Sequence, residues 1–376
     1  MKLLQVKPQI FMFETFNEFA NEFALGADDL LVTHKFLFED YMASTNIVCD
    51  RIFQEEYGAG EPEDEMIDRM FSDLKRPDYK RIIAIGGGTV IDIGKIFALE
   101  RAPKTSMLFD KTYPARKRCE LVIVPTTSGT GSEMTNISIA NIKAKSTKLG
   151  LASDELFADA AVLIPQLVKE LPYKFFIFSA IDALVHAVES YVSPKANILT
   201  ETLSLKACEL ILKGFCGIIT NGENHRKEKA ADFLLASCIA GIAFGNAGVG
   251  AVHALAYPLG GKYHVPHGET NYQFFVSIFE MYQREKGGEK LDILAELITK
   301  ELQFIGMSCE KEHAFARLGD MLGKLMPLKL LREYGMSENE IESFAQNVID
   351  NQQRLLVNSY IPFTTEKAQE IYRLRY

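Results

Sequence analysis

The sequence predicts an α/β protein of two domains, in which a Rossmann-like domain with a parallel sheet is followed by an all-helical domain. Three apolar, β-type runs in the first half, DDLLVTH, RIIAIGGG and ELVIVPTTSGTG, each end in a turn or a glycine-rich loop. This pattern is typical of buried parallel strands that alternate with helices. After about residue 175, long segments with the helical period replace the strand-like runs. We therefore expect an α/β domain over residues 1–175 and a helical domain over 176–376.

The second half contains four long amphipathic segments: TETLSLKACELILKGF, KEKAADFLLASCIAGIAF, GEKLDILAELITKELQF and ENEIESFAQNVIDNQQRLL. Ser337 and Glu340 have the spacing of a capping box and predict the start of the last helix. The apolar stretch 241–261 contains several glycines, a histidine and a proline. Because polar groups are costly inside a membrane, we expect this stretch in the protein interior near a site.

Composition and charge favour a cytoplasmic protein that acts on small molecules. The chain is 47% hydrophobic and 24% charged, which provides for a large core. Its net charge of −9 argues against a nucleic-acid partner. The six cysteines form no CxxC pair, as expected for reduced thiols. The first residues show no secretion signal, so secretion is not expected.

A first glycine-rich loop, in IAIGGGTVIDIGK, is expected to contact a phosphate. Gly86, Gly87 and Gly88 directly follow a predicted strand, and a helix is expected from Thr89 to Lys95. Glycines let the backbone approach a phosphate, and the amide groups at a helix start favour its charge. The spacing matches neither the GxGxxG fingerprint nor a Walker A loop.

A second loop, VPTTSGTGSE, adds hydroxyl groups after the next predicted strand. These come from Thr126, Thr127, Ser128, Thr130 and Ser132. Either loop alone is also compatible with a tight turn that binds no ligand. Two such loops on neighbouring strands favour a nucleotide, whose pyrophosphate and sugars they would hold.

One aspartate and three histidines predict a metal site. Asp182 and His186 are four residues apart and therefore share one face of a helix. His253 and His267 belong to the histidine-rich segment VHALAYPLGGKYHVPHG, in which His264 is a further candidate that we expect near the substrate. One carboxylate and three imidazoles suit Fe²⁺ or Zn²⁺ and leave a position for a substrate oxygen. Taken alone, an Asp–His pair of this spacing is more often an ordinary helix contact.

Four motifs, GGGTVIDIGK, PTTSGTGSE, DALVHAVESYVS and GNAGVGAVHALAYPLGGKYHVPHG, resemble in sequence and order those of the iron-containing (group III) alcohol dehydrogenases. The resemblance covers nearly the whole chain. It implies the fold shared with dehydroquinate synthase, an NAD cofactor, Fe²⁺ with Zn²⁺ as the alternative, and a small alcohol or aldehyde as substrate. It implies no nucleic-acid or membrane partner and is compatible with a homo-oligomer. Through ASDEL, LPYKFF, PHGETNY and REYGM, the chain is most similar to NAD-dependent members that interconvert 4-hydroxybutyrate and succinic semialdehyde.

The resemblance also implies roles for single residues. The metal ligands would be Asp182, His186, His253 and His267. The expected cofactor-binding residues lie in the two loops, with one lysine near the nicotinamide ribose: Gly87, Gly88, Thr89, Asp92, Thr127, Ser128, Thr130 and Lys148.

The sequence departs from the family pattern at three places. Tyr257 stands where members often have a second histidine, so the proton would pass through this phenol, His264 or the ribose hydroxyls. His34 replaces an aspartate that holds the adenosine ribose, which leaves NADP open as a cofactor. YIPF replaces a terminal NPR tract. A substrate carboxylate also needs a cation, for which Lys262 is the candidate.

Other functions stay open at this point. The chain could be a related alcohol dehydrogenase for another primary alcohol or aldehyde. It could be a metal-dependent hydrolase with purely structural glycine loops, a lyase resembling dehydroquinate synthase, or an inactive nucleotide-binding protein. Few Lys or Arg residues fall in the motifs, which disfavours the lyase, and nicotinamide-dependent turnover would separate a dehydrogenase from a hydrolase.

Overall fold

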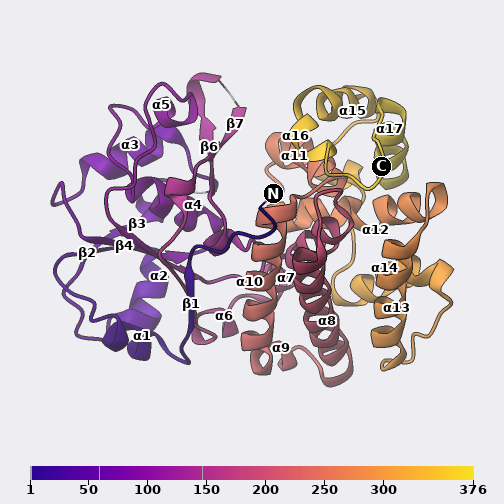
Figure 1. Ribbon diagram of the computed structural model, residues 1–376, viewed down its shortest axis with the longest axis horizontal. Helices are drawn as coiled ribbons and strands as arrows, with labels where there is room; N and C mark the ends of the chain where they lie inside the picture. Colours follow the sequence, from indigo (N-terminus) through magenta and orange to yellow (C-terminus); the bar gives the residue numbers. More distant parts are fainter. Residues whose placement is uncertain (1, 59, 146) are drawn as a thin grey trace. The chain divides into compact units, whose positions relative to one another are not determined.

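A computed structural model describes residues 2–58, 60–145 and 147–376. The chain forms two compact units (Figure 1). The α/β unit runs from Val6 to Leu171 and contains all of the described strands. The helical unit runs from Pro172 to Tyr376 and includes the N-terminal residues up to Gln5. The predicted fold class is confirmed.

The boundary between the units differs slightly from the one we expected between residues 175 and 176. It falls between Leu171 and Pro172, and Pro172 is the N-cap of the first long helix. The N-terminal residues join the helical unit because Gln5 and Asn246 form two hydrogen bonds, from Gln5 N to Asn246 Oδ1 at 2.7 Å and from Asn246 Nδ2 to Gln5 O at 3.0 Å. This long-range contact has no signature in the local sequence.

The α/β unit is built on a six-stranded sheet of order β1-β8-β5-β4-β2-β3, in which all neighbours are parallel. The strands predicted from the three apolar runs are β2, β4 and β5. The others, β1, β3 and β8, have only four residues each, too few to show a clear pattern. The strand bounds are β1 Gln9–Met12, β2 Asp29–Thr33, β3 Asp50–Phe53, β4 Arg81–Gly86, β5 Glu120–Pro125 and β8 Ala160–Leu163.

Helices cover both faces of this sheet. Successive residues of a strand point to opposite faces, and in β2 Leu30 and Val32 join one apolar core while Leu31 joins the other. The first core includes α3 (Asp64–Ser72) and α4 (Gly88–Phe97), and the second includes α1 (Phe16–Glu22) (Figure 1). Short helices complete the unit: α2 (Lys35–Leu37), α5 (Ser106–Phe109) and α6 (Gln166–Lys169).

An antiparallel hairpin, β6 (Ile137–Ile142) with β7 (Thr147–Ala152), follows the second predicted loop. We did not predict it, although β6 alternates between buried and partly buried residues as a half-exposed strand does. The hairpin packs on α4, so it lies beside the helix that follows the first glycine loop.

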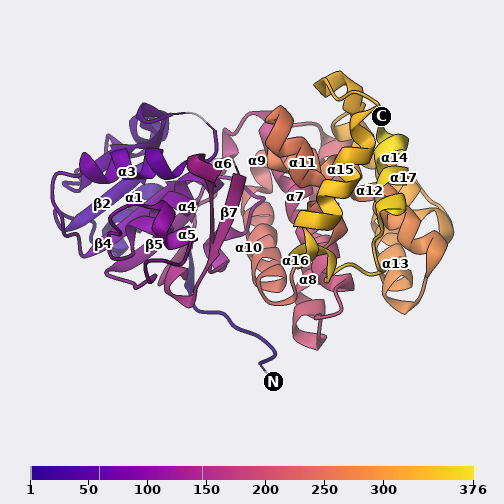
Figure 2. The ribbon, with the colours of Figure 1, turned by 90° about the horizontal axis from the view of Figure 1, so that it is seen from above.

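The helical unit is organised around α7, α8 and α10, which pack on one another. Both α7 and α10 are long and apolar enough to cross a membrane by length and composition, but 89% and 61% of their most apolar windows are buried inside the fold. Figure 2 shows α11, α15 and α17 together in this unit. The bounds are α7 Tyr173–Val192, α8 Ile198–Asn221, α9 His225–Glu228, α10 Ala230–Ala247, α11 Ala251–Tyr263, α12 His267–Glu285, α13 Glu289–Gln303, α14 Ala314–Leu325, α15 Glu340–Asn351, α16 Gln353–Leu356 and α17 Thr365–Arg375.

The last amphipathic segment forms two helices, because the chain breaks at Gln352 between α15 and α16. At its start, the Ser337 N–H donates to the Glu340 carboxylate at 2.7 Å, as in a capping box. The Ser337 hydroxyl donates to the same carboxylate and does not cap the helix backbone, and Asn339 is the N-cap. The stretch 241–261 forms the end of α10 and most of α11, and it is largely buried as expected.

Candidate metal centre and nucleotide loops

Three helices of the helical unit bring the four predicted metal ligands together. Asp182 and His186 lie one turn apart on α7, His253 lies on α11, and His267 is the first residue of α12. One donor atom from each side chain lies within 4.8 Å of the donor atoms of the other three. We call these four side chains the ligand cluster.

Three members of the ligand cluster are buried and one reaches the surface. Asp182, His186 and His253 are 2%, 4% and 3% exposed, whereas the His267 side chain is 42% exposed. The Nε2 atoms of His186 and His253 are 3.0 Å apart, and His267 Nε2 lies 3.7 Å from Asp182 Oδ1. A small molecule would therefore reach the ligand cluster on the His267 side.

The ligand cluster fits Fe²⁺ or Zn²⁺. Burial alone would raise the pKa of Asp182, but the three imidazoles and the Asn271 amide outweigh burial and hold this pKa below its ordinary value. The carboxylate therefore stays ionised, as a metal ligand must. One carboxylate and three imidazoles are a donor set for divalent ions of borderline softness. Metal binding by this cluster stays a prediction.

Glu189 orients one of the imidazoles. It is 1% exposed; its Oε2 lies 2.6 Å from His253 Nδ1, and its Oε1 accepts the Val252 N–H at 2.7 Å. Because an ionised carboxylate only accepts, the proton lies on Nδ1, and Nε2 faces the ligand cluster with a lone pair. Glu189 was not predicted from the sequence, although Asp182, His186 and Glu189 are spaced as one face of a helix.

Asn271 is a second residue near the metal ligands that was not predicted from the sequence. Its Nδ2 donates to Asp182 Oδ1 at 2.7 Å and lies 3.1 Å from His253 Nε2 and 3.2 Å from His267 Nε2. Its Oδ1 is buried and accepts no hydrogen bond from the described residues. In this arrangement the amide nitrogen occupies the space where the donor atoms converge. Asn271 lies four residues after His267, and this one-turn spacing could have placed it beside the ligand.

In the α/β unit, the two predicted nucleotide loops lie against each other. Gly87 is the N-cap of α4 and Gly88 is its first residue. A Cβ atom at Gly88 would lie 3.4 Å from Thr130 Cγ2, and one at Gly87 would lie 3.8 Å from Thr127 Cγ2. The Ser128 hydroxyl is buried and makes no hydrogen bond to the described residues. The start of α4 thus lies beside threonine side chains of the second loop, and the free amide groups of a helix start suit a phosphate.

Asp92 joins the second loop and the hairpin to α4. It accepts hydrogen bonds from the Ser132 hydroxyl at 3.3 Å and from the Ile139 N–H at 3.1 Å. Burial raises the pKa of Asp92 to about 6 and lowers the pKa of the neighbouring Lys95 to about 8. Both carboxylate oxygens of Asp92 are thus engaged by the protein, so its contribution to cofactor binding would be to hold the loops.

Thr89 and Lys148 both contact the segment that precedes α3. The Thr89 hydroxyl donates to the Gly60 carbonyl at 3.0 Å, and Lys148 Nζ lies 2.6 Å from Glu61 Oε2. These contacts place both residues at the edge of the first nucleotide loop. Cofactor binding by either of them stays a prediction.

Comparison with known proteins identifies the family. A model described as iron-containing alcohol dehydrogenase matches residues 8–165, and the C-terminal model of the Fe-containing alcohol dehydrogenase family matches residues 176–376. The chain belongs to the iron-containing alcohol dehydrogenase family. The predicted resemblance is thus confirmed. The 4-hydroxybutyrate dehydrogenase of Clostridium kluyveri is 49% identical over 376 residues, which is all of both chains.

More distant relatives share the fold of this iron-containing alcohol dehydrogenase. Alcohol dehydrogenase from Oenococcus oeni superposes with a TM-score of 0.85 at 22% identity and covers all of both chains. Sulfoacetaldehyde reductase from Bifidobacterium kashiwanohense, solved in complex with NAD⁺, has a TM-score of 0.84 at 20% identity and covers 100% of this chain and 99% of that one. At such identities the likeness concerns the fold.

The departure from the family pattern at Tyr257 lies beside the ligand cluster. The Tyr257 ring centroid is 6.5 Å from that of His267, and the Tyr257 hydroxyl accepts a hydrogen bond from Arg354 Nη2 at 3.2 Å. His264 ends α11 in the left-handed conformation, with a φ of 53°, and is exposed. In the described part of the chain, His264 makes no hydrogen bond or ring contact with the ligand cluster.

Lys262, predicted to bind a substrate carboxylate, forms an ion pair with Glu340. The same carboxylate accepts the Tyr263 hydroxyl at 2.7 Å. Hydrogen bonding by Lys262 is the main reason why the pKa of Glu340 falls to about 2. The Lys262 charge is therefore already compensated by the protein.

At the end of β2, His34 is paired with an acidic residue from the end of β3. His34 Nδ1 lies 3.1 Å from Glu55 Oε2, and the Lys35 N–H donates to Glu55 Oε1. The family's aspartate is thus absent at position 34, but a carboxylate is present beside it.

The YIPF tract near the C-terminus lies in the helical unit, where the Tyr360 hydroxyl donates to the Gly287 carbonyl at 2.7 Å.

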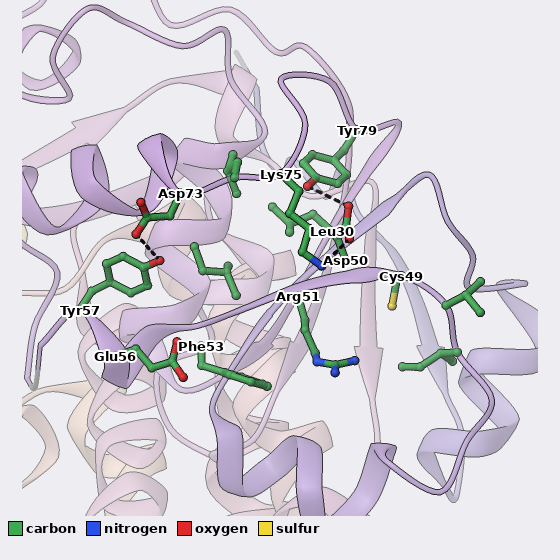
Figure 3. Close-up of a pocket in the computed structure, with 14 residues that line it drawn as sticks. Leu30, Cys49, Asp50, Arg51, Phe53, Glu56, Tyr57, Asp73, Lys75 and Tyr79 are labelled. Atoms are coloured by element: carbon green, nitrogen blue, oxygen red, sulfur yellow. Dashed lines mark hydrogen bonds and ion pairs between the residues drawn. The ribbon is translucent and has the colours of Figure 1, made fainter.

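A pocket of about 540 Å³ opens beside the edge strand β3 (Figure 3). None of its lining residues is a predicted site residue. Asp50 accepts hydrogen bonds from Lys75 Nζ and the Tyr79 hydroxyl, both at 3.2 Å, and the Tyr57 hydroxyl donates to Asp73 at 2.9 Å. Because these polar groups satisfy one another, we assign the pocket no ligand. It is lined by Leu30, Ile47, Val48, Cys49, Asp50, Arg51, Ile52, Phe53, Glu56, Tyr57, Asp73, Leu74, Lys75 and Tyr79.

Proposed function

We propose that this chain is a metal-dependent dehydrogenase that interconverts 4-hydroxybutyrate and succinic semialdehyde with NAD(H). The observation that carries the proposal is the 49% identity, over the full length of both chains, to the 4-hydroxybutyrate dehydrogenase of Clostridium kluyveri. The ligand cluster and the two nucleotide loops support the proposal, because they could hold the metal and the cofactor that such a reaction needs.

The reaction would combine Lewis acidity, from an ion held by Asp182, His186, His253 and His267, with hydride transfer to or from a nicotinamide. The protein prepares the metal ligands for this role. The ionised Asp182 supplies the negative charge of the donor set. Glu189 keeps the His253 proton on Nδ1 and thereby directs Nε2 toward the ligand cluster.

The two nucleotide loops bind the cofactor in this proposal. The first amide groups of α4, behind Gly87 and Gly88, attract the diphosphate. The hydroxyls of Thr127, Ser128 and Thr130, in the neighbouring second loop, would donate hydrogen bonds to the cofactor. Asp92 holds both loops in register through Ser132 and Ile139.

The proton of the alcohol moves through Tyr257 in this proposal. Its hydroxyl both donates and accepts, and its ring lies beside His267, the exposed member of the ligand cluster. His264 is the alternative, but its exposed position at the end of α11 favours direct exchange with water.

The enzyme is proposed to act in the cytoplasm on small alcohols and aldehydes. All six cysteines are free thiols, which suits a reducing compartment. Homo-oligomer formation is a further proposal that sedimentation or light scattering would test.

The proposed function is tested by following NADH or NADPH oxidation with succinic semialdehyde, before and after chelation and after addition of Fe²⁺ or Zn²⁺. We expect turnover that is lost on chelation and restored by metal. Turnover that survives complete metal removal would contradict the metal mechanism. Turnover with plain aliphatic aldehydes but not with succinic semialdehyde would favour a related alcohol dehydrogenase instead.

A further inference from the structure

A substrate that carries a carboxylate opposite its hydroxyl needs a cationic partner for that carboxylate, because an unpaired carboxylate loses its hydration on entering a site. We propose that Arg354, positioned by Tyr257, binds the substrate carboxylate and makes the enzyme select semialdehydes and hydroxy acids over plain aliphatic substrates. This assignment rests on the proposed function.

Arg354 is connected to the ligand cluster through Tyr257. Tyr257 lies one turn after His253 on α11, and its ring centroid is 6.5 Å from that of His267. The Arg354 guanidinium carbon lies 5.4 Å from the Tyr257 ring centroid, and Nη2 donates to the Tyr257 hydroxyl at 3.2 Å. The tyrosine thus lies near both the exposed metal ligand and an arginine.

The upper limit on the separation between Arg354 and the His267 ring is compatible with a four-carbon hydroxy acid. An extended molecule of this kind places its hydroxyl and carboxylate oxygens about 6 Å apart at standard bond lengths. Contacts at its two ends add about 2 Å at a metal site and about 3 Å at a guanidinium. The Tyr257 ring lies 6.5 Å from the His267 ring and 5.4 Å from the Arg354 guanidinium carbon. These two steps set an upper limit on the separation between the two ends, and this limit is comparable with the span of the molecule and its end contacts.

Arg354 also has its charge available. It is exposed, and across residues 2–58, 60–145 and 147–376 it takes part in no ion pair. Lys262, the cation predicted from the sequence, is instead paired with Glu340. A guanidinium can bind a carboxylate through two parallel hydrogen bonds, while one of its nitrogens keeps its contact with Tyr257.

The short helix that carries Arg354 is anchored near the metal-binding helix. Asn358 Nδ2 donates to the Val249 carbonyl at 3.0 Å, in the connection between α10 and α11, and lies 3.4 Å from the Arg354 carbonyl. Gly248, with a φ of 80°, leaves room for this amide, since a Cβ atom there would lie 2.6 Å from Asn358 Nδ2. The backbone of Arg354 is therefore anchored to the connection that leads into α11.

The test compares kcat/KM for succinic semialdehyde with kcat/KM for butanal, which has the same carbon chain without the carboxylate. Arg354→Gln should lower the value for succinic semialdehyde by about 10- to 100-fold, the range expected for hydrogen bonds to a charged group. The value for butanal should change by less than about 3-fold. Arg354→Lys should keep part of the preference for succinic semialdehyde over butanal. Tyr257→Phe should weaken this preference, because it removes the hydroxyl that positions Arg354 and keeps the aromatic ring. The matched control is Arg373→Gln, because Arg373 is an exposed arginine that donates to Gln369 on its own helix.

Calorimetric titration of the metal-loaded, NAD⁺-bound protein with succinate separates this inference from the proposed function. Weaker succinate binding by Arg354→Gln supports the carboxylate site even if succinic semialdehyde is not turned over, in which case only the proposed function fails. Equal succinate binding by wild type and Arg354→Gln overturns the inference. The inference is also overturned if Arg354→Gln lowers kcat/KM equally for succinic semialdehyde and butanal. It is likewise overturned if Lys262→Gln, and not Arg354→Gln, loses the preference for succinic semialdehyde over butanal.

Discussion

Replacing Glu189 by glutamine should weaken metal binding without changing any direct ligand. The two oxygens of Glu189 accept from two separate donors, His253 Nδ1 at 2.6 Å and Val252 N at 2.7 Å. A glutamine has only one acceptor oxygen, and its NH₂ group would face the second donor. One buried donor then loses its partner, at a cost of about 1–3 kcal/mol.

The loss of the carboxylate also leaves the His253 ring free to change its tautomer. Removing such an orienting partner typically lowers metal affinity by about 10- to 100-fold, which corresponds to about 1.4–2.8 kcal/mol. In the metal-free protein, the unpaired donor should lower the melting temperature by several degrees, since each kcal/mol is worth about 2–4 °C in a unit of this size.

Competition with a chelator would measure the metal affinity, and thermal unfolding of the metal-free protein would measure the stability. Glu296→Gln is the control, because Glu296 is an exposed residue paired with Lys311, and such pairs contribute about 0–1 kcal/mol. If Glu189→Gln binds metal within twofold of wild type and melts at the same temperature, Glu189 does not orient His253.

Three further predictions concern other parts of the chain. Burial raises the pKa of Glu133 from 4.5 to about 7, so the folded state binds this proton more tightly and stability should fall as pH rises from about 4.5 to 7. Glu133→Gln should flatten that profile in melting experiments. Glu55→Gln should lower the preference for NADH over NADPH by about tenfold, because it removes a negative charge that would repel a 2′-phosphate. The preference is measured as the ratio of the kcat/KM values for the two cofactors. An unchanged ratio would show that Glu55 takes no part in cofactor selection. Gly268→Ala should lower metal affinity at least about tenfold, because the new Cβ would lie 2.3 Å from the Phe178 carbonyl oxygen and would displace the neighbouring ligand His267. Gly261→Ala is the control and should leave metal affinity unchanged, because Gly261 has open space around it.

Local patterns explain which parts of the fold were predictable. The strands β2, β4 and β5 are apolar runs that end at turns or glycine loops, and buried parallel strands have this pattern. The change to long helices is equally local, because the period of the apolar residues shows it directly. By contrast, β1 and β3 are four-residue edge strands, and the break at Gln352 falls inside a continuous amphipathic pattern. In these cases the contacts made by the folded chain outweigh the local preference.

In the candidate site too, some residues were predictable from local patterns and others were not. Asp182 and His186 were paired from their spacing on one helix, and the clustering of His253 and His267 in one segment completed the set. The contact between Glu189 and His253 crosses two helices, as does the one between Arg354 and Tyr257, and the pairing of His34 with Glu55 crosses two strand ends. Lys262 and Arg354 look equivalent in the sequence, but only the structure shows that Glu340 takes up the charge of Lys262.

The sequence by itself determined the two-part α/β and helical organisation, the family and the chemical types at the site, since periodicity and motifs are properties of neighbouring residues. Only the tertiary structure decided which side chains orient the ligand cluster and which cation is available beside it. The physical reason is that a hydrogen bond or ion pair forms between whichever groups the packing of separate helices brings within about 3 Å. That packing depends on the whole core, and no local stretch of the chain encodes it.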